Sequence, residues 1–78
     1  MDRHKLKGIR TTANLTQTEL ASHLKVTTKT YNHKENGEIE FKLSEILKIA
    51  IFLDMTLQQV NDIFFENKLT ERINKLET

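Results

Sequence analysis

Apolar residues recur along the chain at the three- to four-residue spacing of one helix face, in short segments separated by polar breaks. The pattern predicts helices over about residues 3–13, 16–24 and 27–36, a fourth from Leu43 to Leu53, and a fifth that starts at Thr56. The positions expected to face the core are Leu6, Ile9, Ala13, Leu20, Ala21, Leu24, Leu43, Ile46, Leu47, Ala50, Leu53, Leu57, Val60 and Ile63. The prediction is a compact all-α domain.

Local signals mark where several of these helices begin and end. Thr16 and Glu19 have the spacing of a capping box, as do Thr56 and Gln59, and Thr27 is a candidate cap for the third helix. Asn36-Gly37 suits a left-handed helix end. The helices from Thr16 and Thr27 are therefore separated by only a short turn.

The C-terminal part of the chain has more apolar surface than one small core can bury. Ile49, Ile51 and Phe52 add apolar surface around the fourth helix, and at least one of the adjacent Phe64 and Phe65 should point away from the core. In the tail over residues 67–78, the apolar residues fall at i, i+4 and i+7, and they are Leu69, Ile73 and Leu76. A helix of this length is marginal alone, so this stripe either folds back on Phe64 and Ile51, pairs with a second subunit, or is a chance pattern in a frayed tail.

Composition narrows the class of protein. The 78 residues make one small domain, without cysteine for disulfides or thiolate metal sites and without proline. Neither a membrane-length apolar run nor a secretion signal is visible, which favours the cytoplasm. No nucleophile–base set or metal-ligand cluster is apparent, so neither an enzyme nor a cofactor is expected.

The charges are unevenly distributed along the chain. Residues 1–34 hold seven basic and two acidic residues, a net charge of +5, whereas residues 35–78 have a net charge of −4. A basic N-terminal half is typical of a one-sided nucleic-acid binder, although small helical proteins also show such asymmetry by chance. Within that half, the segment from Thr27 has few apolar and many polar side chains, which suits a helix in the major groove.

The segment LTQTELASHLKVTTKTYNHKENG over residues 15–37 resembles the helix-turn-helix of the lambda Cro and CI repressor family, also called the xenobiotic-response-element class. The residues that match in register are Leu15, Thr16, Gln17, Leu20, Ala21, Val26, Glu35, Asn36 and Gly37. Similarity extends over about residues 4–65, and it implies a five-helix lambda-repressor-like domain over residues 1–66 with a short helical tail over residues 67–78 as a possible dimerisation helix.

The resemblance also implies roles for individual residues. Base contacts are expected from Thr28, Lys29, Asn32 and His33. Phosphate contacts are expected from Thr16, Gln17, Thr27, Asn36 and Lys42. Arg10 and Glu35 are expected to form an ion pair between helices, and Tyr31 to lie in the core with its hydroxyl at the rim. Lys25 departs from the glycine that the family favours, and a left-handed conformation there costs ~1 kcal/mol.

The function implied is that of a cytoplasmic, sequence-specific repressor of transcription that binds a two-fold symmetric double-stranded DNA operator as a homodimer. Candidate dimer contacts are Phe52, Phe64, Phe65, Leu69, Ile73 and Leu76. An alternative is a protein-interaction module on the same fold, such as an antitoxin or anti-repressor, that binds its partner through the fourth helix and the tail. The chain could also be the N-terminal domain of a longer repressor.

Overall fold

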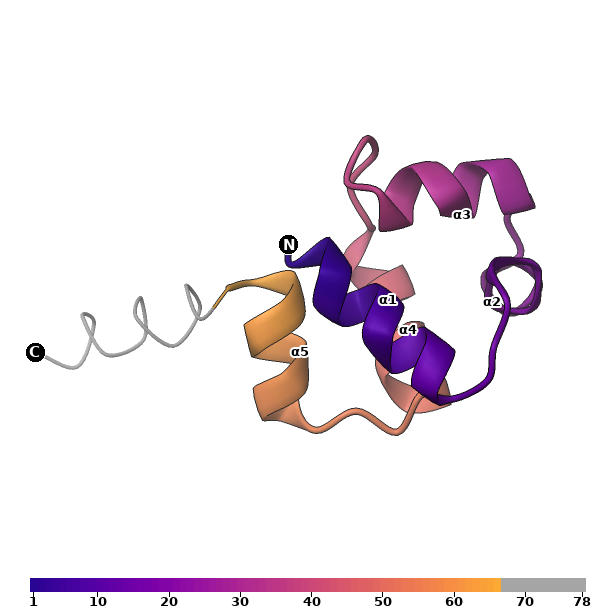
Figure 1. The fold of residues 1–78 in the computed structure, drawn as a ribbon. Coiled ribbons are helices and arrows are strands. Elements are labelled where there is room, and N and C mark those ends of the chain that lie inside the picture. Colours follow the sequence, from indigo (N-terminus) through magenta and orange to yellow (C-terminus); the bar gives the residue numbers. More distant parts are fainter. Residues whose placement is uncertain (67–78) are drawn as a thin grey trace, which may run out of the picture.

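The computed structural model describes residues 1–66, in which five α-helices and no strands are found (Figure 1). The helices are α1 Arg3–Thr12, α2 Gln17–Leu24, α3 Thr28–Glu35, α4 Leu43–Phe52 and α5 Leu57–Phe64. The predicted all-α five-helix fold is confirmed. The apolar stripe of the tail lies outside the described residues.

Side chains next to the helix starts set those starts locally. The Asp2 carboxylate accepts a hydrogen bond from the Lys5 backbone N–H at 3.1 Å, which caps α1. Both predicted capping boxes are confirmed, at Thr16 for α2 and at Thr56 for α5. Thr27 caps α3 by accepting from the Thr30 backbone N–H at 3.1 Å. Each of these contacts spans three residues, so the neighbouring sequence alone determines where these helices begin.

The turn between α2 and α3 depends on a left-handed residue. Lys25 has φ 59° and ψ 41°, the conformation that the missing glycine would adopt more easily. The left-handed backbone at Lys25 turns the chain so that the Val26 backbone N–H donates to the Ala21 carbonyl at 3.0 Å. It also places the half-buried Val26 against the core. Gly37, with φ 83°, ends α3 in the same way.

Replacing Lys25 by glycine should therefore raise the free energy of unfolding by about 0.5–1 kcal/mol, because it relieves the steric cost of the left-handed backbone at some expense of unfolded-state entropy. Urea denaturation followed by circular dichroism measures the change. The control is Ser22→Gly at an exposed helical position of α2, which should destabilise by about the same amount. Destabilisation by both substitutions would show that Lys25 is not strained.

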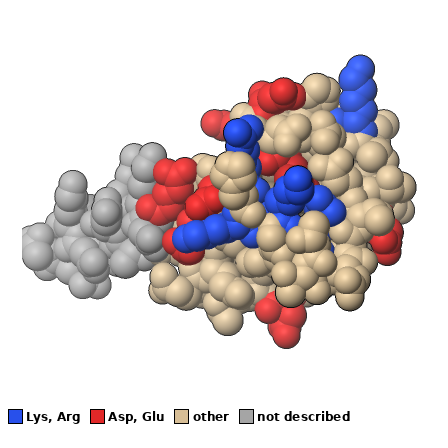
Figure 2. Space-filling view, viewed as in Figure 1, with Lys and Arg blue, Asp and Glu red and all other residues tan. Residues whose placement is uncertain are grey.

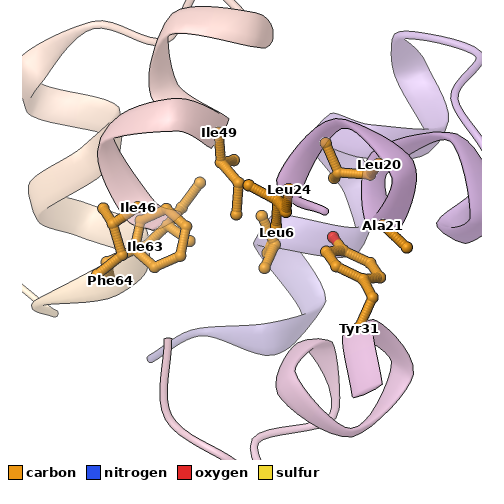
Figure 3. Packing of buried hydrophobic residues seen from close by; sticks show 9 residues of the cluster. All are labelled: Leu6, Leu20, Ala21, Leu24, Tyr31, Ile46, Ile49, Ile63 and Phe64. Atoms are coloured by element: carbon orange, nitrogen blue, oxygen red, sulfur yellow. The ribbon is translucent and has the colours of Figure 1, made fainter. Parts of the chain in front are cut away.

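A core shared by all five helices holds the domain together (Figure 3). Its buried apolar residues are Leu6, Leu20, Ala21, Leu24, Tyr31, Ile46, Ile49, Ile63 and Phe64. The half-buried Phe41, from the loop before α4, extends this core, because its ring packs edge-on against Phe64 with centroids 5.6 Å apart. The loop is thereby anchored against the last residue of α5.

The predicted core stripe of α4 is wrong at two positions. Leu43 and Leu47 are 64% and 53% exposed, whereas Ile49, which was expected outside the stripe, is fully buried. Because α4 is apolar around most of its circumference, helical spacing permits more than one buried face. Packing against α2 and α5 selects the face of Ile46 and Ile49. Leu43, Leu47 and the 82% exposed Ile51 then form an apolar stripe on the opposite side.

Other core predictions also need correction. Leu57 is 80% exposed at the first position of α5, and Ala13 lies exposed just beyond the end of α1. Phe64 belongs to the core with 8% of its surface exposed, so it is not available as a dimer contact. We expected at least one of Phe64 and Phe65 to point away from the core. Instead, the half-buried Phe65 also packs against the core.

Tyr31 is buried as predicted, but its hydroxyl is not at the rim. The side chain is fully buried, and its hydroxyl oxygen is itself shielded from solvent close to the Glu35 carboxylate. Burial, together with the nearby Glu35 carboxylate, raises the pKa of Tyr31 above its ordinary value. Tyr31 therefore fixes the inner side of α3 by packing.

Candidate nucleic-acid interface

Helix α3 presents two different sides. Its inner side carries the buried Tyr31, Lys34 and Glu35, which follow the i, i+3, i+4 spacing of one helix face. On the other side lie Thr28, Lys29, Asn32 and His33, the first two exposed and the others half-buried. In Figure 1, α3 lies along one edge of the domain beside α2. The four residues expected to contact bases therefore lie on the side of α3 away from its buried residues.

A buried ion pair joins the end of α3 to α1. Arg10 donates from Nε to Glu35 Oε2 at 2.9 Å and from Nη2 to Glu35 Oε1 at 3.0 Å. Its Nη1 donates to the Leu15 carbonyl at 2.8 Å, in the connection between α1 and α2. The pair expected from the family resemblance is thus present, with two parallel hydrogen bonds that satisfy both buried charges.

A second buried ion pair, which sequence analysis missed, joins α3 to α4. Lys34 Nζ donates to Glu45 Oε1 at 2.5 Å, and the same carboxylate oxygen accepts from the Lys42 backbone N–H at 2.8 Å. Burial alone raises the pKa of the Glu45 carboxyl, but these hydrogen bonds and the nearby lysine charges outweigh burial and hold the pKa below its ordinary value. The sequence does contain one indication of this pair. Lys34 follows Tyr31 by three residues, which places the lysine on the inner side of α3.

Part of the charge asymmetry along the sequence stabilises the fold. Lys5 Nζ pairs with the Asp62 carboxylate at 2.7 Å, and the N-terminal amino group pairs with Glu66 at 2.8 Å. Together with Lys34–Glu45, these contacts join basic groups early in the chain to acidic groups later in it. Figure 2 accordingly shows Lys and Arg side chains interspersed with Asp and Glu on the face over α1 and α5. The +5 of the first 34 residues thus overstates the charge free to meet a polyanion.

The candidate base-contacting side chains differ in how far the protein already engages them. Thr28 Oγ1 donates to Thr18 Oγ1 at 3.2 Å, and the His33 ring contacts the Glu38 carboxylate through Nδ1. Within residues 1–66, no hydrogen bond or ion pair engages the Lys29 ammonium. Lys29 is therefore the candidate whose donors are all available to DNA.

Asn32 lies between two other side-chain amides. Its Nδ2 donates to Gln17 Oε1 at 3.0 Å, at the start of α2. Its Oδ1 accepts from Asn36 Nδ2 at 3.2 Å, at the end of α3. The two helices of the motif are thus joined by side-chain hydrogen bonds as well as by the turn.

The candidate phosphate-contacting residues are all exposed or half-buried, and two of them, Thr16 and Thr27, also cap helices. The Thr16 backbone N–H donates to the Glu19 carboxylate at 3.1 Å, and the Thr27 hydroxyl is the cap of α3. Gln17 is half-buried, and Asn36 and Lys42 are exposed. The side chains of Gln17 and Lys42 consequently retain free donors for a phosphate.

The loop after α3 carries the acidic residues Glu38 and Glu40, both exposed. Glu38 contacts the imidazole ring of His33 on α3. Glu40 has no such partner among the described residues. Repulsion of phosphate by this loop therefore centres on Glu40.

No helix within residues 1–66 is long and apolar enough to cross a bilayer. The same residues contain no group of three or more His, Asp or Glu side chains placed to hold a metal ion.

Comparison with known proteins agrees with the geometry. A family model described as helix-turn-helix matches residues 6–60, which includes α1 from Leu6 onward, all of α2 to α4, and the first half of α5. No curated protein and no solved structure matches the chain. The family consists of DNA-binding regulators rather than enzymes. The chain belongs to the Cro/CI-type helix-turn-helix family of DNA-binding transcription regulators.

Proposed function

We propose that this protein is a sequence-specific repressor that places α3 in the major groove of a two-fold symmetric operator. The observation that carries the proposal is the division of α3 into a side held by two buried ion pairs and a side of polar groups exposed to solvent. A rigidly held helix loses little conformational freedom on binding, so its contacts translate efficiently into affinity. Repression then follows from occlusion of the promoter and needs no cofactor.

On the exposed side of α3, Lys29 addresses guanine O6 and N7, Thr28 packs against a thymine methyl group, and His33 donates to a base or a phosphate. Gln17 and Lys42 bind phosphates on either side of the recognition helix, with Asn36 near the end of α3. Asn32 lies on the same side, but its amide already makes two contacts within the protein.

The protein acts as a homodimer, with residues 1–66 as the DNA-binding domain and residues 67–78 as a dimerisation segment. Two observations support a second copy as partner. Phe52 is 41% exposed although its ring stacks on His23 with centroids 4.0 Å apart. Leu43, Leu47 and Ile51 also form an exposed apolar stripe on α4. Association would remove this surface from water.

Selection of bound sequences from a random duplex pool, at near-physiological salt, tests the proposal. We expect enrichment of a two-fold symmetric site whose half-sites lie about 34 Å apart, one turn of DNA. An enriched site without symmetry would contradict the dimer, and failure to enrich any site would contradict sequence-specific binding.

The exposed stripe of α4 also favours a second candidate, a protein-interaction module in which Leu43, Leu47 and Ile51 bind a partner protein. Such a module would bind DNA weakly and without sequence preference. The same selection experiment separates the two functions, because only the repressor enriches a defined site.

A further inference from the structure

Three side-chain amides form a continuous chain of hydrogen bonds across the helix-turn-helix. Asn36 Nδ2 donates to Asn32 Oδ1 at 3.2 Å, and Asn32 Nδ2 donates to Gln17 Oε1 at 3.0 Å. We call these three residues the amide chain. It begins at the exposed Asn36 beyond the end of α3 and reaches the first residue of α2.

The direction of the hydrogen bonds orients the terminal amide. An amide has one acceptor oxygen and one nitrogen with two donor hydrogens. Because Gln17 uses its oxygen to accept from Asn32, its Nε2 is directed away from that bond and keeps both donors. The Gln17 side chain therefore offers donors, rather than its acceptor, to a group that lies beyond the start of α2.

The same bonds limit what Asn32 can do. Recognition of adenine by asparagine uses the oxygen and the nitrogen of the amide together, in one plane. In Asn32 each of these atoms already has a partner within the protein, and the side chain is half-buried. Each bond takes one of the two hydrogens of Nδ2 or one of the two lone pairs of Oδ1, so Asn32 could read a base only with the remaining hydrogen and lone pair, in an orientation that the two bonds already fix.

We propose that Asn32 is a positioning residue, which holds the Gln17 amide with its donors toward a DNA phosphate and does not itself select a base. The proposal rests on the proposed function and refines the role expected of Asn32. It assigns base selection on α3 chiefly to Lys29, whose ammonium has no partner within residues 1–66. Asn32 then couples phosphate binding by Gln17 to the orientation of α3, because its side chain contacts Gln17 directly.

A double-mutant cycle tests the proposal. The dissociation constants of the wild type, Asn32→Ala, Gln17→Ala and the double variant are measured by fluorescence anisotropy, on the selected operator and on a scrambled duplex of equal length. We expect Asn32→Ala to weaken binding to both duplexes by about tenfold, because a hydrogen bond to a charged phosphate is lost. Their affinity ratio should stay unchanged, and in the Gln17→Ala background the Asn32 substitution should have almost no further effect.

The opposite result would contradict the proposal. If Asn32→Ala reduces the ratio of operator to scrambled affinity tenfold or more, and does so with or without Gln17, Asn32 selects a base and the proposal is wrong. Lys29→Ala is the matched control for base selection, because it should lower that ratio. Thermal unfolding of each variant shows whether the fold is retained.

Nuclear magnetic resonance of the free protein gives a readout that is independent of DNA. The side-chain amide resonances of Gln17 should shift in Asn32→Ala and stay unchanged in Lys29→Ala. Unshifted Gln17 resonances in Asn32→Ala would show that the amide chain is absent and would overturn the proposal. If the wild type prefers no sequence, the proposed function fails, yet the cycle on the scrambled duplex still decides whether Asn32 acts through Gln17. Absence of binding to any duplex would overturn both.

Discussion

Replacing Glu35 by alanine should lower the free energy of unfolding by about 3–5 kcal/mol, because it leaves the buried Arg10 guanidinium without its partner. Glu35 is 2% exposed and accepts two hydrogen bonds from Arg10. Small domains have total stabilities of about 5–15 kcal/mol, so the variant should be partly or wholly unfolded at 37 °C. The loss would disorient α3 and abolish DNA binding together with the fold.

Urea denaturation followed by circular dichroism measures the effect of Glu35→Ala. The matched control is Glu38→Ala, which removes an exposed glutamate three residues later and should change the stability by less than about 1 kcal/mol. Because most of the cost comes from the unpaired charge, replacing Arg10 by methionine and Glu35 by leucine together should recover much of it. A loss below about 1 kcal/mol in Glu35→Ala would mean that water reaches Arg10 and that the pair does not hold α3.

Replacing Lys29 by alanine should reduce the preference for operator over scrambled DNA by about 1–3 kcal/mol, the usual discrimination from one specific base contact. Lys29 is exposed on α3 and makes no contact that the fold needs within residues 1–66, so stability should be unchanged. Fluorescence anisotropy with the two duplexes at fixed salt measures the ratio of dissociation constants. A uniform weakening on both duplexes would instead indicate that Lys29 binds phosphate.

Lys48→Ala is the charge-matched control for Lys29→Ala. Lys48 is an exposed lysine on α4, so its removal changes the net charge equally but leaves α3 untouched. We expect the affinity ratio of this variant to equal that of the wild type. If both lysine variants lose selectivity alike, net charge rather than the recognition face determines the preference.

The helix starts could be predicted because their causes are local. Thr16, Thr27 and Thr56 each accept from a backbone N–H three residues later, a contact that forms whenever the helix does. The family match over residues 6–60 likewise rests on the register of these short patterns. For the same reason the two helices of the motif and the turn between them were predicted within one or two residues.

The choice of buried face on α4 could not be predicted in this way. Leu43 and Leu47 satisfy the helical spacing as well as Ile46 and Ile49 do, yet only the isoleucines are buried. The free energy gained by burying a face of α4 depends on which helices pack against it, and these helices are α2 and α5. Leu57 on α5 is exposed for the same reason.

The sequence by itself determined the helices, their caps, the left-handed turn at Lys25 and the family, because these depend on interactions between residues close together in the chain. The tertiary structure alone decided which side of each helix is buried and which side chains meet across helices. Lys34 meets Glu45, and Asn32 meets Gln17, only after α3 and α4 have both packed against α2. Such contacts depend on how whole helices are placed relative to one another. The packing of the shared core sets this placement, and the spacing of residues along the chain does not encode it.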